Sequence, residues 1–163
     1  MAIKRKGVAL VDASGSMNQR IIKGIVKDMN RASSDDGFAV FAFGSNIITV
    51  KSFDDTWKGL ELPPETLGGT DLAFALKTLP TLLREMGERG AMALVVISDF
   101  EIQWSDIQKC KRMLTAFRKR GWQTIAVFVD EGVFQTGERA YQAAVKMFGK
   151  KNVAKSTQLK FER

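Results

Sequence analysis

The sequence predicts an α/β domain with a mostly parallel central sheet, one antiparallel edge strand and helices on both faces. Short apolar runs alternate along the chain with amphipathic helical patterns, which is typical of parallel strands joined by crossover helices. Two of the runs are separated only by a turn signal, and such a short connection requires an antiparallel hairpin. The 163 residues, 45% hydrophobic and 26% charged, suit a single globular domain.

The first half of the chain supplies three strands and one helix before a long loop. Residues 8–11 are a continuous apolar run, as expected for a strand buried on both faces. Residues 17–29 repeat an apolar residue at every fourth position, which predicts a helix with one apolar face. Residues 38–43 and 47–50 flank the turn Gly44-Ser45-Asn46 and form the hairpin, and residues 51–69 resemble a loop.

The second half continues the alternation. Apolar residues recur in steps of four and three from 72 to 86, which predicts a helix that Pro80 should kink or shorten. Strands are expected at 93–97 and 124–129. The helix between them should begin at a capping box of Ser105 and Gln108 and stop at Gly121. The last helix should end at Gly149, with a short edge strand near 152–154.

These elements form one domain. We expect residues 1–163 to be a single unit, with a core over about 3–150 and a basic C-terminal segment at 151–163. The basic start Lys4-Arg5-Lys6 precedes an apolar run that is too short for a signal peptide or a membrane span. We therefore expect a soluble, cytoplasmic protein that does not bind membranes.

The composition excludes several kinds of active site. The chain has 0 His and 1 Cys, which excludes a Ser-His-Asp triad, a Cys-His pair and histidine-ligated zinc. Cys110 lies on an apolar helical stripe, so we expect an inert core residue. Any metal must be bound through oxygen, as Mg²⁺, Mn²⁺ and Ca²⁺ are.

Small oxygen-bearing side chains follow the predicted strands at one edge of the sheet. Asp12-Ala13-Ser14-Gly15-Ser16 follows the first strand, Gly68-Gly69-Thr70-Asp71 opens a helix, and Ser98-Asp99 follows the fourth strand. In such sheets ligands bind outside the carboxyl ends of the strands. The hydroxyl and carboxylate groups suit a hard cation such as Mg²⁺. The pair Asp130-Glu131, after the fifth strand, shares that edge without a tie to the metal.

These residues resemble the metal-ion-dependent adhesion site of the von Willebrand factor A domain family. The family pattern is Asp-x-Ser-x-Ser, a distant Thr and a later Asp, and the element order also fits to about Gly149. The resemblance implies a Rossmann-like fold that binds Mg²⁺ or Mn²⁺, rather than Ca²⁺, and captures the carboxylate of a protein partner. The implied metal-site residues are Asp12, Ser14, Ser16, Thr70 and Asp99.

Within the family, the stretches around Thr70 and Asp99 are most similar to the A domain of Ro-type (TROVE) RNA-binding proteins. Many family members carry Gly after the last Asp, whereas this chain has Phe100 and Glu101. Phe100 places an apolar group beside the site, and Glu101 adds an acid that could repel or replace a partner carboxylate. Trp57 and Trp104 also lie near this edge and could contact a partner or cover the core.

Ordinary structural roles remain open for each of these residues. Asp12 could end a strand, Ser16 and Thr70 could be helix caps, and Asp99 could be a strand-end acid. The net charge of +7 is concentrated near the C-terminus, where residues 146–163 hold six basic residues and one acid. Together with a basic stretch at 109–120, this segment could bind nucleic acid or could be a solvated face.

The sequence therefore favours a metal-dependent protein-binding module without enzymatic activity. The family resemblance suggests an adaptor in an intracellular complex, for which one possible partner is an AAA+ ATPase of the MoxR or chelatase type. A nucleic-acid-associated module is the alternative. A metal-dependent hydrolase ranks last, because the chain has no histidine to act as a general base.

Overall fold

The computed structural model describes residues 6–13, 23–25, 27, 38–53, 69–130 and 137–158. The strands are β1 (Gly7–Asp12), β2 (Phe38–Phe43), β3 (Ile47–Lys51), β4 (Ala93–Ser98), β5 (Gln123–Phe128) and β6 (Val153–Lys155). The helices are α2 (Leu72–Glu85), α3 (Trp104–Lys119) and α4 (Gly137–Phe148), with short 3₁₀ turns η1 (Lys150–Asn152) and η2 (Ser156–Gln158). The predicted α/β class is confirmed.

The six strands form one sheet in the order β3-β2-β1-β4-β5-β6, and only the β2–β3 pair is antiparallel. Every residue of β1, β2 and β4 is buried, which explains their continuous apolar runs. Gly7 begins β1 where it meets β2: a Cβ there would lie 2.4 Å from the ring of Phe38. β6 extends the sheet by pairing with β5 within the segment 151–163.

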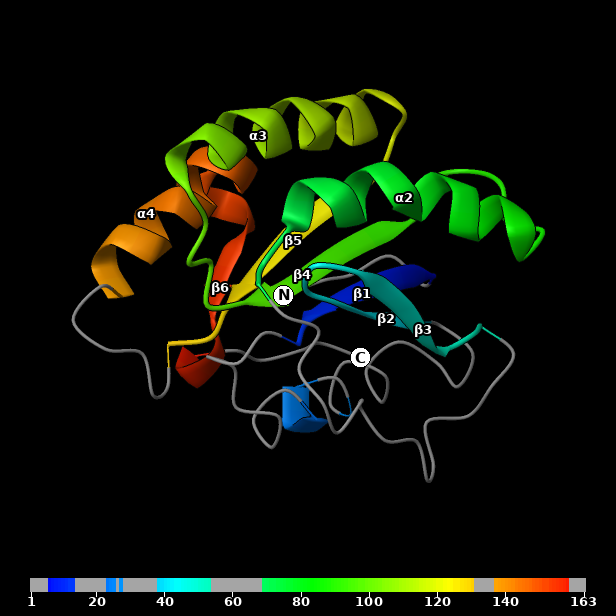
Figure 1. Cartoon of the computed structure of the whole chain (residues 1–163), viewed down its shortest axis with the longest axis horizontal. Coiled ribbons are helices and arrows are strands. Elements are labelled where there is room, and N and C mark those ends of the chain that lie inside the picture. The colour runs from blue at the N-terminus through cyan, green and yellow to red at the C-terminus, as the bar shows by residue number, and fades with distance from the viewer. Residues whose placement is uncertain are drawn as a thin grey trace.

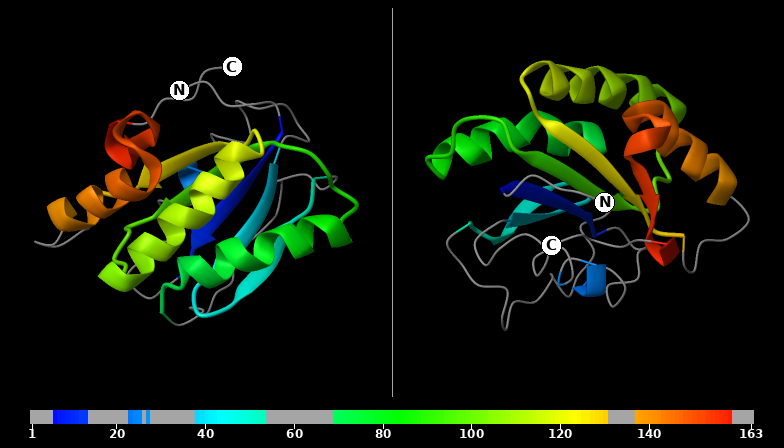
Figure 2. Two further views of the ribbon diagram at one scale, coloured as in Figure 1. Left: turned by 90° about the horizontal axis from the view of Figure 1, so that it is seen from above. Right: turned by 180° about the vertical axis from the view of Figure 1, so that it is seen from behind.

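Figure 1 shows helices α2, α3 and α4 on one side of the sheet, and the central strands are buried on both of their faces. Helices α2, α3 and α4 bury a large apolar cluster against one face, and Figure 2 shows the three lying across that face. The opposite face holds a second cluster, which includes Ile25. Residues 23–25 are helical, and the rest of the helix predicted at 17–29 lies largely outside the described residues.

The boundaries of two helices differ from those predicted. Helix α2 continues through Pro80 to Glu85, so the proline does not move the boundary. Helix α3 begins at Trp104 with Gln103 as its N-cap, so the expected capping box of Ser105 and Gln108 is wrong. The Gln103 carbonyl accepts hydrogen bonds from the N–H groups of Asp106 and Ile107 and starts the helix without a side-chain cap. Both Gly121 and Gly149 have positive φ and follow helices, as predicted.

Within the described ranges, none of the helices has the length and apolar character needed to cross a bilayer.

Candidate metal centre

Two aspartates lie at the ends of neighbouring strands, at the carboxyl edge of the sheet. Asp12 is the last residue of β1, and Asp99 follows the end of β4. β1 and β4 are parallel neighbours with Val11 opposite Ile97, so Asp12 is level with the end of β4. Asp12 is fully buried and Asp99 is 5% exposed. Burying a carboxylate is costly unless it is hydrogen-bonded or binds a metal.

Ser98 joins these two segments. Its hydroxyl donates a 2.6 Å hydrogen bond to Oδ2 of Asp12 and accepts one of 2.9 Å from the N–H of Phe100. The N–H of Glu101 donates to Oδ1 of Asp99 at 3.3 Å. Residues at the end of β4 and just after it therefore hydrogen-bond to both carboxylates.

The backbone on either side of Thr70 is held to the β2–β3 turn. The N–H of Gly69 donates to Oγ of Ser45 at 3.0 Å, and the N–H of Asp71 donates to the carbonyl of Gly44 at 2.9 Å. This turn follows β2, the neighbour of β1 in the sheet. Thr70 is half-buried. It therefore lies at the same edge as Asp12 and Asp99.

Thr70 is not the cap of α2. The carboxylate of Asp71 accepts a 2.9 Å hydrogen bond from the N–H of Phe74 and caps the helix. The capping role that the sequence left open for Thr70 thus belongs to its neighbour. The predicted ligands Ser14 and Ser16, like Trp57, lie outside the described residues, and their roles stay predictions.

Asp130 is engaged elsewhere. Its carboxylate accepts hydrogen bonds from the hydroxyls of Ser156 at 2.8 Å and Thr157 at 2.6 Å, and from the Thr157 N–H at 3.1 Å. Burial alone would raise the pKa of Asp130, but these hydrogen bonds outweigh it and hold the pKa below its ordinary value. Asp130 therefore anchors the C-terminal segment, and Glu131 lies outside the described residues.

The residues at this edge fit a hard cation. Asp12, Thr70 and Asp99 offer only oxygen, and two of them are buried carboxylates. No three His, Cys, Asp or Glu side chains gather as a metal site among the residues that the structure describes. A donor set of two carboxylates and hydroxyls is instead the set that the sequence predicts, and it suits Mg²⁺ or Mn²⁺.

Sequence reasoning missed Ser98 and the backbone of Phe100. The sequence marks Ser98 only as the residue before Asp99, because its hydrogen bond to Asp12 depends on strand register. Phe100 has a φ of 53°, the only positive value among described non-glycine residues. Its place after Asp99, where many family members carry glycine, was the available signal.

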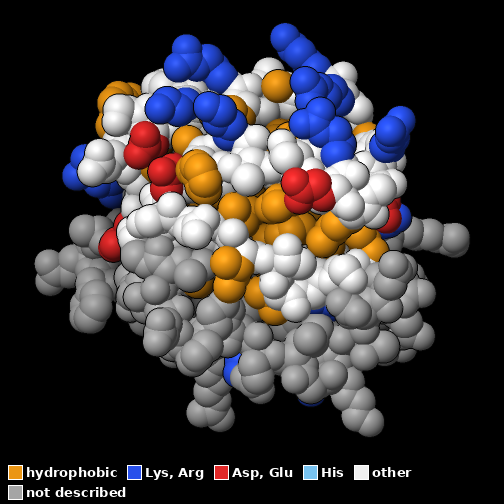
Figure 3. Space-filling model, turned by 45° about the vertical axis from the view of Figure 1, so that its right-hand side comes forward, with side chains coloured by type: hydrophobic (Ala, Val, Ile, Leu, Met, Phe, Trp, Pro, Cys, Tyr) orange, Lys and Arg blue, Asp and Glu red, His pale blue; other side chains and the backbone are white. Residues whose placement is uncertain are grey.

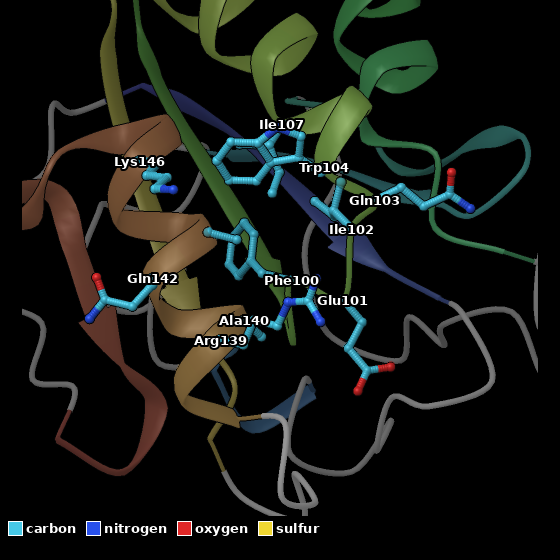
Figure 4. Close-up of a pocket in the computed structure, with 11 residues that line it drawn as sticks. Phe100, Glu101, Ile102, Gln103, Trp104, Ile107, Arg139, Ala140, Gln142 and Lys146 are labelled. Atoms are coloured by element: carbon cyan, nitrogen blue, oxygen red, sulfur yellow. The ribbon is translucent and has the colours of Figure 1, made fainter.

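A pocket of about 590 Å³ lies beside this edge, between α3 and α4 (Figure 4). Three predicted partner-binding residues, Phe100, Glu101 and Trp104, are among those that line it. Phe100 is buried, Glu101 is exposed and Trp104 is 57% exposed.

No protein-family model and no curated protein matches the chain. Solved structures are nevertheless similar. An aerotolerance-related membrane protein from Bacteroides fragilis, carrying multiple mutations to serines, is 15% identical with a TM-score of 0.59, over 91% of this chain and 89% of that one. BatB from Bacteroides thetaiotaomicron is 16% identical with a TM-score of 0.59, over 92% and 89%.

Manganese-loaded TRAP protein from Plasmodium vivax is 13% identical with a TM-score of 0.60, over 94% of this chain and 69% of that one. At these identities the similarity shows the fold alone. The chain has a von Willebrand factor A-like fold.

Proposed function

We propose that this chain is a metal-dependent protein-binding module. Mg²⁺ or Mn²⁺ would be held at the carboxyl edge by Asp12, Ser14, Ser16, Thr70 and Asp99. One observation carries the proposal: Asp12, Thr70 and Asp99, which are far apart in the sequence, lie at one edge of the sheet. The manganese-loaded TRAP structure, which has the same fold, supports a metal of this kind.

The side chains would leave the cation open to an outside ligand. Hydroxyl ligands carry no charge, so a bound ion would keep positive charge and accept a carboxylate from a partner. Ser98 positions Asp12 through its 2.6 Å hydrogen bond and so orders the site in advance. Glu101, exposed two residues after Asp99, adds negative charge beside the site, so it would repel a partner carboxylate or take its place at the cation.

The identity of the partner is a finer proposal. We propose an adaptor that works in the cytoplasm, with an AAA+ ATPase of the MoxR or chelatase type as one candidate partner. The likeness to Ro-type proteins rests only on the sequence around Thr70 and Asp99, and the similar structures give this subtype no support. Two similar structures are BatB and an aerotolerance-related membrane protein. If this chain instead worked in an assembly at a membrane, the proposed cytoplasmic location would be wrong.

Thermal unfolding with and without Mg²⁺ or Mn²⁺ tests the metal site. Binding to the folded state alone stabilises it by mass action, and about a hundredfold excess over Kd is expected to raise Tm by about 5–10 °C. The rise should disappear in Asp12→Asn and Ser14→Ala. It should persist in the control variant Glu138→Gln, an exposed acid on α4.

A pull-down from the native host, with and without EDTA, tests the partner. Proteins retained by the wild type should be released by EDTA and be absent with Asp12→Asn. A Tm that does not respond to millimolar metal, or a set of captured proteins indifferent to EDTA, would contradict the proposal.

The basic helix α3 favours nucleic acid as a second candidate ligand. Figure 3 shows Lys and Arg side chains gathered over the helix layer. The exposed cations along α3 and at its C-cap are Lys109, Lys111, Arg112, Lys119 and Arg120. In the described part of the chain the one ion pair joins Lys6 to Glu88, so no ion pair neutralises these cations.

The C-terminal cations are partly engaged within the fold. Lys146 lies over the ring of Trp104 and Lys155 over that of Tyr141. Binding of a fluorescent single-stranded RNA should therefore depend on α3, weaken steeply with salt and weaken further in a Lys111→Gln, Arg112→Gln double variant. The matched control is Lys77→Gln on α2. Binding that ignores salt or survives the double variant would exclude this candidate.

A hydrolase ranks behind both candidates. The chain has no histidine, and hydroxyl ligands make a poor electrostatic site for activating water. Turnover in a phosphatase or nuclease screen that depends on Glu101 would reverse this order.

A further inference from the structure

The pocket between α3 and α4 has the dimensions and lining of a binding site. Its volume of about 590 Å³ falls within the range of roughly 300–1,000 Å³ that is usual for ligand pockets. The apolar lining includes Phe100, Trp104 and Ile107 on one side and Ala140 and Ala143 of α4 on the other. In Figure 4 the rings of Phe100 and Trp104 face the space between the helices, while Gln103 extends away from it.

The side chain of Trp104 is more exposed than those of the other large hydrophobic residues that the structure describes. It is 57% exposed, against 40% for Phe74 and 36% for Ile48, the other exposed large hydrophobic residues that the structure describes. The ammonium group of Lys146 lies 4.0 Å from the center of its ring and holds the indole at the pocket. Exposed, oriented tryptophan is the side chain most enriched at the energetic centers of protein interfaces.

The charges around the pocket favour an anionic occupant. Arg139 and Lys146 line it from α4, against the single acid Glu101. Within the described ranges Arg139 has no ion pair. The first turn of α3 also faces this region, and its N-cap Gln103 makes no side-chain cap hydrogen bond. The positive end of the α3 dipole therefore adds to the two cations.

The pocket is joined to the metal site through the backbone. Phe100, at the pocket, immediately follows Asp99, and its N–H is bonded to the same Ser98 hydroxyl that donates to Asp12. Phe100 keeps its positive φ while its ring packs edge to face on Phe148, with centroids 5.8 Å apart. The hydrogen bond and the ring contact together hold Phe100 in its strained conformation. They therefore keep this wall of the pocket next to Asp12 and Asp99.

We propose that the α3–α4 pocket binds a large apolar side chain flanked by a carboxylate, from an acidic segment of the same partner whose Asp or Glu reaches the metal. The apolar side chain lies between Trp104 and α4, and the flanking carboxylate pairs with Arg139 and Lys146. The inference rests on the proposed metal-dependent function for the identity of the partner. The chemistry of the pocket itself does not require the metal.

The first experiment measures the pocket alone, in EDTA, with the aromatic anion 1-anilinonaphthalene-8-sulfonate as the probe. Fluorescence titration should give an affinity that falls about tenfold or more in Trp104→Ala and in Arg139→Glu. The first variant removes the apolar contact with the aromatic rings, and the second removes the charge that pairs with the sulfonate. The matched controls are Phe74→Ala and Arg112→Glu, which alter an exposed ring on α2 and an exposed cation on α3. Equal binding by the pocket variants and their controls would overturn the proposal.

The second experiment measures the partner chemistry with an array of ten-residue peptides in Mg²⁺. Each peptide carries one central Asp, a second acid, and Trp, Leu or Ala at a varied distance. The wild type should prefer Trp or Leu at a defined spacing. Trp104→Ala and the pocket-filling Ala143→Leu should lose that preference while still binding Asp peptides in a Mg²⁺-dependent manner.

The two failures give different results. A preference for Trp or Leu that survives both pocket variants, or no such preference in the wild type, overturns the pocket assignment. A pocket-dependent preference that is unaffected by EDTA and by Ser14→Ala supports the pocket and contradicts the proposed metal function.

Discussion

The two edges of the sheet gather different kinds of side chain. The carboxyl edge collects Asp12, Asp99 and Thr70, whereas the amino edge collects cations from the ends of α3 and α4. Arg118 ties those helix ends together by donating to Thr124 at 3.1 Å and to the Phe148 carbonyl at 3.3 Å. Lys119, Arg120, Lys150 and Lys151 are exposed nearby.

The difference shows which charges the fold itself explains. All three helices lead back from the carboxyl edge, so their C-terminal ends lie at the amino edge, where cations offset the helix dipoles. Asp71 is likewise explained, because it caps α2. Asp99 caps no helix, since the N-cap of α3 is Gln103. Capping of α3 therefore does not account for its near-complete burial.

Replacement of Phe100 should have the largest effect and tests whether the carboxyl edge is strained. Phe100→Ala should lower the free energy of unfolding by about 3–5 kcal/mol through loss of a buried ring. Phe100→Gly should cost about 1 kcal/mol less than Phe100→Ala, because glycine adopts a positive φ without a Cβ penalty. Urea denaturation measures both.

Phe148 provides the matched pair, because it has helical backbone at the end of α4 and its ring packs on that of Phe100. Phe148→Ala should therefore be more stable than Phe148→Gly, the reverse of the order at Phe100. The same order at both positions would show that the backbone of Phe100 is unstrained.

Two hydroxyl deletions compare the edges more finely. Ser98→Ala removes two buried hydrogen bonds and should cost about 2 kcal/mol, with a smaller metal-induced rise in Tm. Thr124→Val removes one bond from Arg118, which keeps its bond to the Phe148 carbonyl, and should cost less than about 1 kcal/mol. A metal response reduced equally in both variants would show that Ser98 has no special link to the site.

Asp130→Asn tests the anchor of the C-terminal segment and should cost about 1 kcal/mol at neutral pH. The hydrogen bonds from Thr157 and Ser156 lower the pKa of Asp130 despite its partial burial. A lowered folded-state pKa stabilises above the unfolded-state pKa, and this stabilisation is lost as the pH falls through the folded-state pKa. The variant and wild type should therefore converge in strong acid. A difference independent of pH would contradict this assignment.

Cys110, buried in the helix layer between the edges, should show the smallest effect. Burial, reinforced by Asp106, raises its pKa to about 12, so roughly one thiol in ten thousand is ionised at pH 8. Iodoacetamide at pH 8 should leave the native protein unlabelled and should label it in denaturant. Rapid native labelling would show that α3 opens readily.

The sequence predicted most of the sheet and the edge where the candidate site lies. Continuous apolar runs identified the buried strands. The rule that parallel strands share a carboxyl edge anticipated that Asp12 and Asp99 lie at the same edge, whereas Ser14 and Ser16 lie outside the described residues. Patterns along the chain could not identify Ser98, because its partner Asp12 lies 86 residues away and meets it only through strand register. The start of α3 was missed because a carbonyl, rather than a capping side chain, opens it.

Gly7 has a consequence for recognising distant relatives. A side chain there would collide with Phe38, so β1 and β2 can approach only if that position stays glycine or the ring moves. Five residues later, at the other end of β1, lies Asp12, which we propose as a metal-site residue. A distant relative that keeps the glycine and loses the aspartate would keep the close approach of β1 and β2 but lack one carboxylate of the proposed metal site.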